Sequence, residues 1–148
     1  MKLIPYSNTY SKCLNDVYGH KTTNKLINRG VYRYLSVLGL LRSNMYMCIN
    51  NDDVIGWGCI IRKINVKSLK IETWIAAIYI LESFRHQNLG TQMMQNIISE
   101  CRSKNYNCLQ LYVEKNNIGA CKLYEKLGFI YEKCYKNRIY YKMTYIIQ

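Results

Sequence analysis

The sequence predicts an α/β domain built on a mixed β-sheet, because of the order of its elements. Extended segments follow one another at 45–50, 54–64 and 68–81, separated by short turns, which is typical of an antiparallel meander. The last of them connects to another strand, 108–113, through a helical pattern at 88–104. A strand–helix–strand connection of this kind gives a parallel pair with a right-handed crossover. Antiparallel and parallel pairs together make the sheet mixed.

The length and composition indicate a single domain, residues 1–148, with one core. About half of the residues are hydrophobic and only one is proline, which argues against extensive disorder. The formal net charge of +12 favours anionic partners, without choosing among nucleotides, nucleic acid and an anionic surface. Because lysines and arginines are scattered and no nucleic-acid motif is present, we do not expect nucleic acid as a partner.

The cysteines indicate a reducing compartment rather than a disulfide framework or a zinc site. They are seven, no two form a C-x-x-C pair, and most fall at apolar positions. Residues 1–7 lack the apolar core of a signal peptide, and the longest apolar run, 74–81, is too short to span a bilayer. We therefore expect a soluble, intracellular (cytoplasmic) protein with no metal and no membrane partner. The oligomeric state stays open, with a homodimer as one option.

The N-terminal part of the chain is patterned less clearly. Residues 2–6 suit a first strand, and two short helices with polar caps are predicted at 10–17 and 24–29. The apolar, tyrosine-rich segment 31–41 fits either a helix or a loop.

A strand, a short polar link and a helix in the middle of the chain favour anion binding. Residues 74–81 read as a buried strand, and apolar residues from Leu89 onward recur at helical spacing. The first turn of that helix carries free backbone N–H groups and the positive end of the helix dipole. Gly90 lets a phosphate approach this turn, and Arg85 and His86 add charge beside it. The alternative is an ordinary solvated turn.

A second helix is predicted over 117–129, directly after the strand at 108–113. Asn116 or Asn117 is its cap, Gly128 is its stop, and Tyr124 lies on its apolar face. The chain then closes with a hairpin of two segments, 129–135 and 139–146.

These segments resemble the two signature motifs of the GCN5-related N-acetyltransferase (GNAT) family. The family's acyl-CoA motif is Arg or Gln, two residues, Gly, one residue, then Gly or Ala. Here it reads Arg85-His86-Gln87-Asn88-Leu89-Gly90. Asn88 stands where the family usually has its first glycine, and Asn tolerates left-handed dihedrals better than most residues. The second motif is carried by Asn117, Ala120 and an unbroken Leu-Tyr-Glu-Lys-Leu-Gly-Phe at 123–129.

The resemblance implies the GNAT-like acyl-CoA N-acyltransferase fold, a twisted mixed sheet of six or seven strands flanked by about four helices. It also implies an enzyme that moves an acetyl group from acetyl-CoA directly to a primary amine. The acceptor is an unidentified small molecule or protein. The alternatives are a non-catalytic ligand-binding or interaction protein of the same fold, and a basic nucleic-acid-binding module.

The resemblance further implies where acetyl-CoA binds. The strand over 74–81 is expected to bulge and to diverge from the next strand, although no glycine marks the bulge. Its backbone then pairs with the pantetheine arm as a neighbouring strand would. The residues expected to contact the cofactor are Ile78, Tyr79, Ile80, Arg85, His86, Gln87, Asn88, Leu89, Gly90, Thr91, Asn117 and Tyr124.

The expected catalytic residues are one phenol and a choice of carboxylates. Tyr124 matches the family's tyrosine and, as a phenol with a pKa near 10, is protonated at neutral pH and able to protonate the leaving thiolate. Glu82 and Glu114 are the candidate general bases, with Glu72 on the strand itself as a further one. The family's mid-strand glutamate is absent, because 75–77 reads Ile-Ala-Ala. Each glutamate is also a candidate for a simple surface group.

Overall fold

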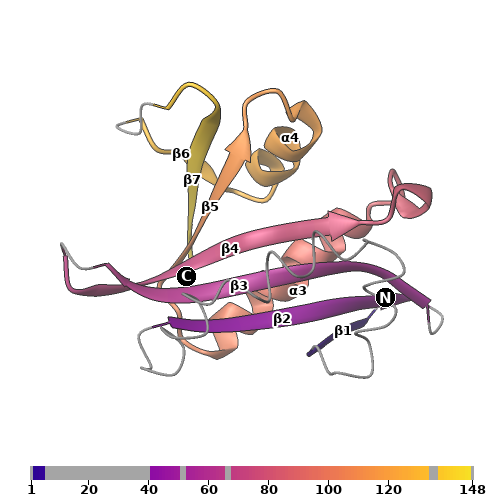
Figure 1. The fold of residues 1–148 in the computed structure, drawn as a ribbon, viewed down its shortest axis with the longest axis horizontal. Helices are drawn as coiled ribbons and strands as arrows, with labels where there is room; N and C mark the ends of the chain where they lie inside the picture. Colours follow the sequence, from indigo (N-terminus) through magenta and orange to yellow (C-terminus); the bar gives the residue numbers. More distant parts are fainter. Residues whose placement is uncertain (1, 6–40, 51–52, 66–67, 134–136, 148) are drawn as a thin grey trace.

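The computed structural model describes residues 2–5, 41–50, 53–65, 68–133 and 137–147. These residues form a seven-stranded mixed sheet in the order β1-β2-β3-β4-β5-β7-β6, together with two α-helices (Figure 1). The predicted α/β class with a mixed sheet is confirmed. The helices predicted at 10–17 and 24–29 lie outside the described residues, as does nearly all of the segment 31–41.

The predicted antiparallel meander of three strands is confirmed, and β1 adds a fourth antiparallel strand to it. The four strands pair with one another in chain order, and the third and fourth agree with the prediction to within two residues. The second is longer than the predicted 45–50, because it continues to pair with its neighbour back to Leu41. The strands are β1 (Lys2–Pro5), β2 (Leu41–Asn50), β3 (Asp53–Asn65) and β4 (Lys70–Ile80).

A bulge interrupts β4 at Ala76. Cys59 of β3 pairs with Ala77, whereas the next residue of β3, Ile60, pairs with Ile75, so Ala76 is an extra residue on β4. An extra residue bends a strand and increases its local twist. The expected bulge is therefore present at an exposed alanine, without a glycine to mark it.

Beyond the bulge, β4 diverges from β5 (Cys108–Glu114). The two strands are parallel, as predicted, but they pair only at Trp74–Gln110 and Ile75–Leu111. Figure 1 shows β5 rising away from β4 past this point. The divergence separates two strands that are neighbours in the sheet.

The expectation of a wholly buried strand over 74–81 is wrong beyond Ile75. Trp74 and Ile75 are buried, whereas Ala76 is exposed and the rest of the strand is half-buried. The reason is the divergence, because a strand that leaves its neighbour no longer has side chains and backbone covering that edge.

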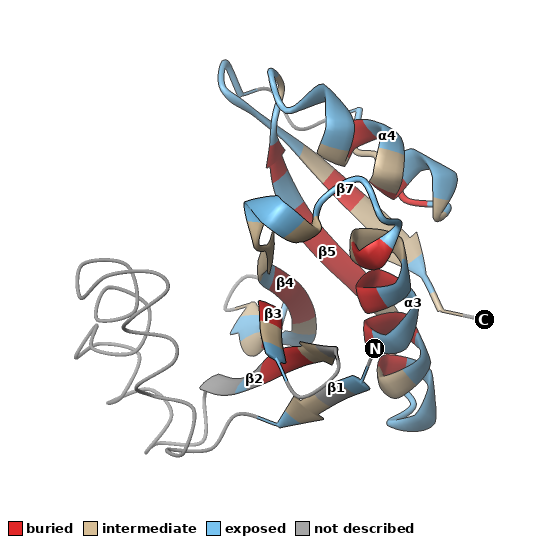
Figure 2. Ribbon diagram, turned by 90° about the vertical axis from the view of Figure 1, so that its right-hand side faces the viewer, coloured by how far each residue is buried: buried red, intermediate tan, exposed pale blue. Residues whose placement is uncertain are grey.

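Both helices pack into the same core cluster as the sheet. α3 (Leu89–Ser103) buries six residues at helical spacing and turns them toward the sheet (Figure 2). α4 (Ile118–Lys126) follows β5, with Asn117 as its N-cap and Gly128 in the left-handed region at φ 93° after its end. The bounds agree closely with the predicted helices.

Within the described residues, no helix combines the length and apolarity needed to cross a membrane.

The closing hairpin is shorter than predicted. β6 (Ile130–Tyr131) has two residues, and it pairs antiparallel with β7 (Tyr140–Ile146). β7 lies between β5 and β6, so β6 is an edge strand with one neighbour. Very short edge strands are common, because they offer little unpaired backbone to another chain. The predicted strand over 129–135 is therefore wrong at residues 132 and 133, which are not strand. Residues 134 and 135 lie outside the described part of the chain.

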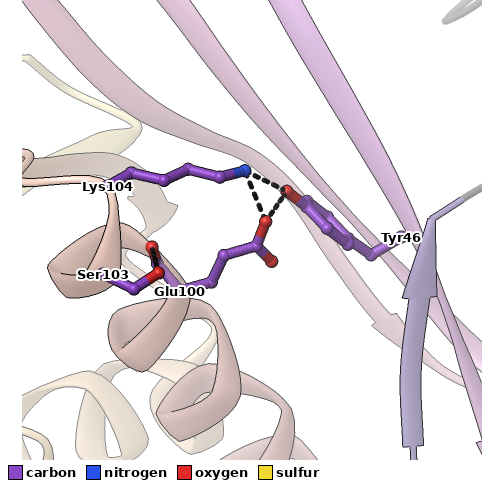
Figure 3. A network of polar contacts seen from close by, with 4 residues as sticks. All are labelled: Tyr46, Glu100, Ser103 and Lys104. Carbon is purple, nitrogen blue, oxygen red and sulfur yellow. Dashed lines mark hydrogen bonds and ion pairs between the residues drawn. The ribbon is translucent and has the colours of Figure 1, made fainter.

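A polar network ties α3 to β2 near the end of the helix. The Tyr46 hydroxyl donates to Glu100 Oε1 at 2.5 Å, and Lys104 Nζ lies 2.5 Å from the same oxygen (Figure 3). Burial raises the pKa of Tyr46 to about 12, and the hydrogen bond to Glu100 adds to the effect. The network helps to hold the long helix in register over the meander, and so to place its first turn.

Candidate active site

The divergence of β4 and β5 opens a cavity of about 280 Å³. Past the last paired residues, backbone N–H and C=O groups of both strands face the gap instead of each other. An extended ligand can pair with such an edge through main-chain hydrogen bonds. The walls are residues Ile75, Ala76, Ala77 and Ile78 of β4, Leu111, Tyr112, Val113 and Glu114 of β5, Asn117, Ala120 and Tyr124 around α4, and Tyr140 of β7.

The loop before α3 contains two residues in the left-handed region. Asn88, the residue just before the helix, has φ 61° and ψ 10°, and His86 has φ 62°. Asn88 thus adopts the left-handed conformation at the position that departs from the motif's usual glycine. Asparagine is among the few residues other than glycine that adopt this region readily.

The first turn of α3 presents unused amides. The first backbone bond of the helix joins the Gln92 N–H to the Asn88 carbonyl at 3.1 Å, so the N–H groups of Leu89, Gly90 and Thr91 have no partner within the helix. The Asn88 side chain makes no capping bond and the first turn holds no acidic residue. The positive end of the helix dipole is thus available to an anion.

Gly90 keeps the space in front of these amides open. A Cβ built at this position meets Leu123 Cδ1 at 3.8 Å, an ordinary van der Waals contact. Packing within the protein therefore does not require glycine here. The open amides fit a diphosphate of the kind that acetyl-CoA carries.

Arg85 lies across the end of β4. Its Nε–H donates to the Ile80 carbonyl at 3.1 Å, and its guanidinium carbon lies 5.4 Å from the centre of the Tyr79 ring. Gln87 donates to the Ser83 carbonyl at 3.4 Å, a long bond at an exposed site. The expected cofactor residues on β4 and in the loop are therefore neighbours, and the Ile80 carbonyl already has a donor.

Tyr124 forms part of the cavity wall from α4. Its side chain is only 9% exposed and its ring packs against Phe129, with ring centres 5.7 Å apart. Burial raises the pKa of Tyr124 to about 12, and Cys121 adds to the effect. The phenol is therefore protonated at neutral pH and able to donate a proton into the cavity.

Asn117 lines the cavity beside Tyr124 and caps α4. Its Oδ1 accepts from the Ala120 N–H at 3.1 Å. The capping bond uses the oxygen, so Nδ2 is the atom available to a ligand.

The candidate carboxylates lie in different places. Glu114 is exposed and lines the cavity. Glu82 is exposed in the short 3₁₀ turn η2 (Glu82–Phe84) after β4, and it is not among the lining residues. The structure therefore brings Glu114, and not Glu82, together with Tyr124.

Glu72 does not belong to the site. It lies near the start of β4, before the paired residues and away from the cavity. Its carboxylate accepts hydrogen bonds from Asn65 at 2.6 Å and from Trp74 Nε1 at 2.9 Å. Burial favours a higher pKa for Glu72, but these hydrogen bonds and the nearby lysines outweigh it, so its pKa is lowered. A base role for Glu72 is not supported.

Sequence reasoning missed two tyrosines that line the cavity. Tyr112 and Glu114 are two residues apart in β5, so both lie on the same face of the strand, and both line the cavity. The Tyr112 ring stacks on Trp74 with ring centres 4.8 Å apart. That position is readable from the period-two pattern of the strand. Tyr140 reaches the cavity because it pairs opposite Glu114, and this register depends on how β7 inserts into the sheet.

Comparisons with known sequences find a matching family and a relative. The profile described as the acetyltransferase (GNAT) family matches residues 8–129. N-alpha-acetyltransferase 30 of Schizosaccharomyces pombe is 26% identical over 136 residues, which cover 90% of this chain and 87% of the relative.

Comparisons with solved structures agree with the fold. The structure of Arabidopsis thaliana Naa50 in complex with the bisubstrate analogue CoA-Ac-MVNAL superposes with a TM-score of 0.68 at 17% identity, over 97% of each chain. The structure of yncA from Salmonella typhimurium, a putative acetyltransferase with its cofactor acetyl-CoA, gives a TM-score of 0.73 at 15% identity. The match covers 100% of this chain and 94% of that one.

Proposed function

The chain belongs to the GNAT acetyltransferase family, and on this premise we propose that it transfers the acetyl group of acetyl-CoA directly to the α-amino group of a polypeptide. The observation that carries the proposal is the cavity between β4 and β5, which has a buried phenol in its wall. The similarity to an N-alpha-acetyltransferase favours an α-amino acceptor over other primary amines.

In this proposal the two sides of the gap bind acetyl-CoA in different ways. The amides of residues 89–91 hold the diphosphate, and Gly90 lets it come close. The exposed backbone of β4 from Ile78 to Ile80 pairs with the pantetheine arm, and Arg85 shifts from the Ile80 carbonyl when the arm arrives. Asn117 contacts the arm from the side of α4.

The proposed chemistry forms one bond and breaks one. The neutral amine attacks the thioester carbonyl, the new C–N bond forms, and the C–S bond breaks with the electron pair leaving on sulfur. Backbone N–H groups of β4 near Ile78 stabilise the oxyanion that develops on the way. Tyr124 donates its proton to the departing thiolate.

The amine must lose a proton, and Glu114 is the proposed acceptor, directly or through a water molecule. It is the candidate carboxylate that lines the cavity with Tyr124. Glu82, just past the end of β4, is the second candidate. A cavity lined by both a phenol and a carboxylate favours a transferase over a non-catalytic protein of the same fold and over a nucleic-acid-binding module.

The test combines binding and turnover. Acetyl-CoA at about 100 times its dissociation constant is expected to stabilise the protein by about 2.7 kcal/mol, measured as a shift of the thermal melt. Tyr124→Phe keeps the packing of the ring and is expected to lower the turnover of an amino-terminal peptide by about 100-fold or more, followed as release of free CoA. The thermal shift of this variant should match the wild type.

Two results would reject the proposal. The absence of a thermal shift at millimolar acetyl-CoA would exclude binding in the gap. Unchanged turnover in the Tyr124→Phe variant would remove the phenol from the mechanism.

A further inference from the structure

A second cavity, of about 550 Å³, lies where β5 ends and the β6–β7 hairpin begins. Its basic lining residues are Lys115, Lys133 and Arg138, and the rings of Tyr131 and Tyr141 complete much of the wall. Its size is within the range of small-molecule and side-chain binding pockets.

The charge of this cavity is not neutralised within the described part of the chain. Its one acidic lining residue, Glu132, is already engaged, because its Oε1 lies 3.1 Å from Lys142 Nζ and accepts from the Thr144 hydroxyl at 2.8 Å. None of the three basic residues that line it forms an ion pair with a described carboxylate. An anionic group entering the cavity therefore meets three cations.

The basic cavity adjoins the transfer cavity along the chain. Glu114 and Tyr140 line the transfer cavity and pair with each other, while Lys115 directly follows the first and Arg138 comes two residues before the second. At about 3.8 Å between consecutive Cα atoms, these cations begin within about 8 Å of the residues at the rim. Tyr140 and Tyr141 are neighbours in β7 and line one cavity each, so the cavities lie on opposite faces of this strand. An extended polypeptide that passes over the end of the strand covers the distance in about three residues.

Local hydrogen bonds hold the basic groups in place. Asn137 Oδ1 accepts from the Ile139 N–H at 2.8 Å and from the Tyr140 N–H at 3.0 Å, which fixes the turn that carries Arg138. The Lys115 N–H donates to the Ile139 carbonyl at 2.9 Å, and Lys115 Nζ lies 5.0 Å from the centre of the Tyr141 ring. Arg138 and Lys115 are thus carried by hydrogen-bonded backbone.

From this arrangement we infer that the acceptor polypeptide carries acidic side chains at about its second to fourth residues, bound by Lys115, Lys133 and Arg138. The inference rests on the proposed function and names the acceptor class for the same site. Carboxylates match these cations in charge, and arginine binds them with two parallel hydrogen bonds. Lysine-rich or polyamine acceptors are disfavoured at this rim, because like charges repel.

The experiment uses acetyl-CoA and three peptides that differ only at residues 2–4, which are acidic, serine or lysine. The wild type is expected to acetylate the acidic peptide with the highest kcat/KM and the lysine peptide with the lowest. Arg138→Glu should lower kcat/KM for the acidic peptide by about tenfold and raise it for the lysine peptide, because it replaces attraction by repulsion. The thermal shift of this variant with acetyl-CoA should match that of the wild type, which shows that the variant is folded and binds the acetyl donor.

The matched control is Lys70→Glu, the same charge change at an exposed site at the start of β4. It should leave the order of the three peptides unchanged. The preference should also shrink when salt is raised from 50 to 500 mM, because the Debye length falls to a few ångströms.

The outcomes separate the inference from the proposed function. Equal kcat/KM values for the three peptides in the wild type would overturn the inference while leaving acetylation of polypeptides intact. An equal change of preference in the Lys70→Glu control would overturn it too, because overall charge would then explain the preference. Failure to acetylate any of the peptides would reject the polypeptide acceptor itself.

Discussion

The two described helices both follow an asparagine, yet they begin in opposite ways. Before α4, Asn117 has φ −83° and its side chain accepts the Ala120 N–H at 3.1 Å. Before α3, Asn88 has φ 61° and its side chain makes no capping bond. One helix start is closed by its own asparagine, and the other is left open.

The two helix starts serve different purposes: the start of α4 is structural, and the start of α3 is suited to binding. A capped start satisfies its amides internally, so α4 is free to offer a side chain, Tyr124, to the cavity. An open start forgoes the stability of a cap and keeps its amides for an anion. The same residue type serves both purposes, because the backbone conformation decides whether the side chain reaches the first turn.

The largest expected effect comes from closing the open start with Gly90→Glu. A carboxylate in the first turn suits the helix dipole, and glutamate is a better helix former than glycine, so the free energy of unfolding should stay level or rise. The same carboxylate occupies the place of a diphosphate, and the Kd for acetyl-CoA should rise by tenfold or more. Calorimetry and urea unfolding measure the two effects.

The control for this variant is Gly90→Ala. Leu123 leaves room for its Cβ, so the fold should tolerate it, and its loss of affinity should be much smaller than that of Gly90→Glu, because alanine adds a methyl group and no charge. Wild-type affinity in the Gly90→Glu variant would show that the phosphates bind elsewhere.

The stability of the protein at alkaline pH tests the burial of Tyr124 on α4. Its pKa is raised from 10.0 in the free side chain to about 12 in the folded protein, so the folded state holds the proton after the unfolded state has lost it. The stability from this group is complete below pH 10 and is lost as pH rises toward 12. Between pH 9 and 11 the wild type should lose about 1 kcal/mol more than Tyr124→Phe, measured by urea unfolding.

Other raised groups, such as Tyr46, destabilise both proteins alike in this pH range. An identical pH dependence in the two proteins would mean that the phenol is solvated in the folded state.

The smallest effects come from the two asparagines themselves. Asn117→Ala removes a cap and should lower the free energy of unfolding by about 1 kcal/mol, or a few degrees in Tm. Asn88→Gly removes no cap and relieves a left-handed backbone, so stability should stay level or rise by a few tenths of a kcal/mol. Thermal melts of both variants measure the contrast. A loss of stability at Asn88 as large as that at Asn117 would show that the open start is capped in solution.

Much of the fold was predictable because local sequence patterns indicate it. The bounds of β3, β4, α3 and α4 follow from alternation, helical spacing and the flanking Asn and Gly residues. The left-handed conformation at Asn88 is one that asparagine tolerates, and it depends on the residue and its place before a helix. These features are set by contacts a few residues apart.

The residues that line the cavity were only partly predictable from the sequence. Tyr124 and Asn117 were expected and line the cavity with Glu114, whereas Glu72 is held elsewhere and Tyr140 was missed. The bulge at Ala76 leaves no mark in the sequence, because an extra residue in one strand is defined only by the register of its partner. The shortness of β6 likewise follows from its place at the edge of the sheet.

By itself, the sequence determined the elements, their order and the open amides before α3, because hydrophobic spacing and backbone preferences act over one or two turns. Only the tertiary structure decided that β4 leaves β5 after two paired residues, and that cations of the β6–β7 hairpin line a second cavity. Strand register and the insertion of β7 bring together residues far apart in the chain, and no local pattern contains that information.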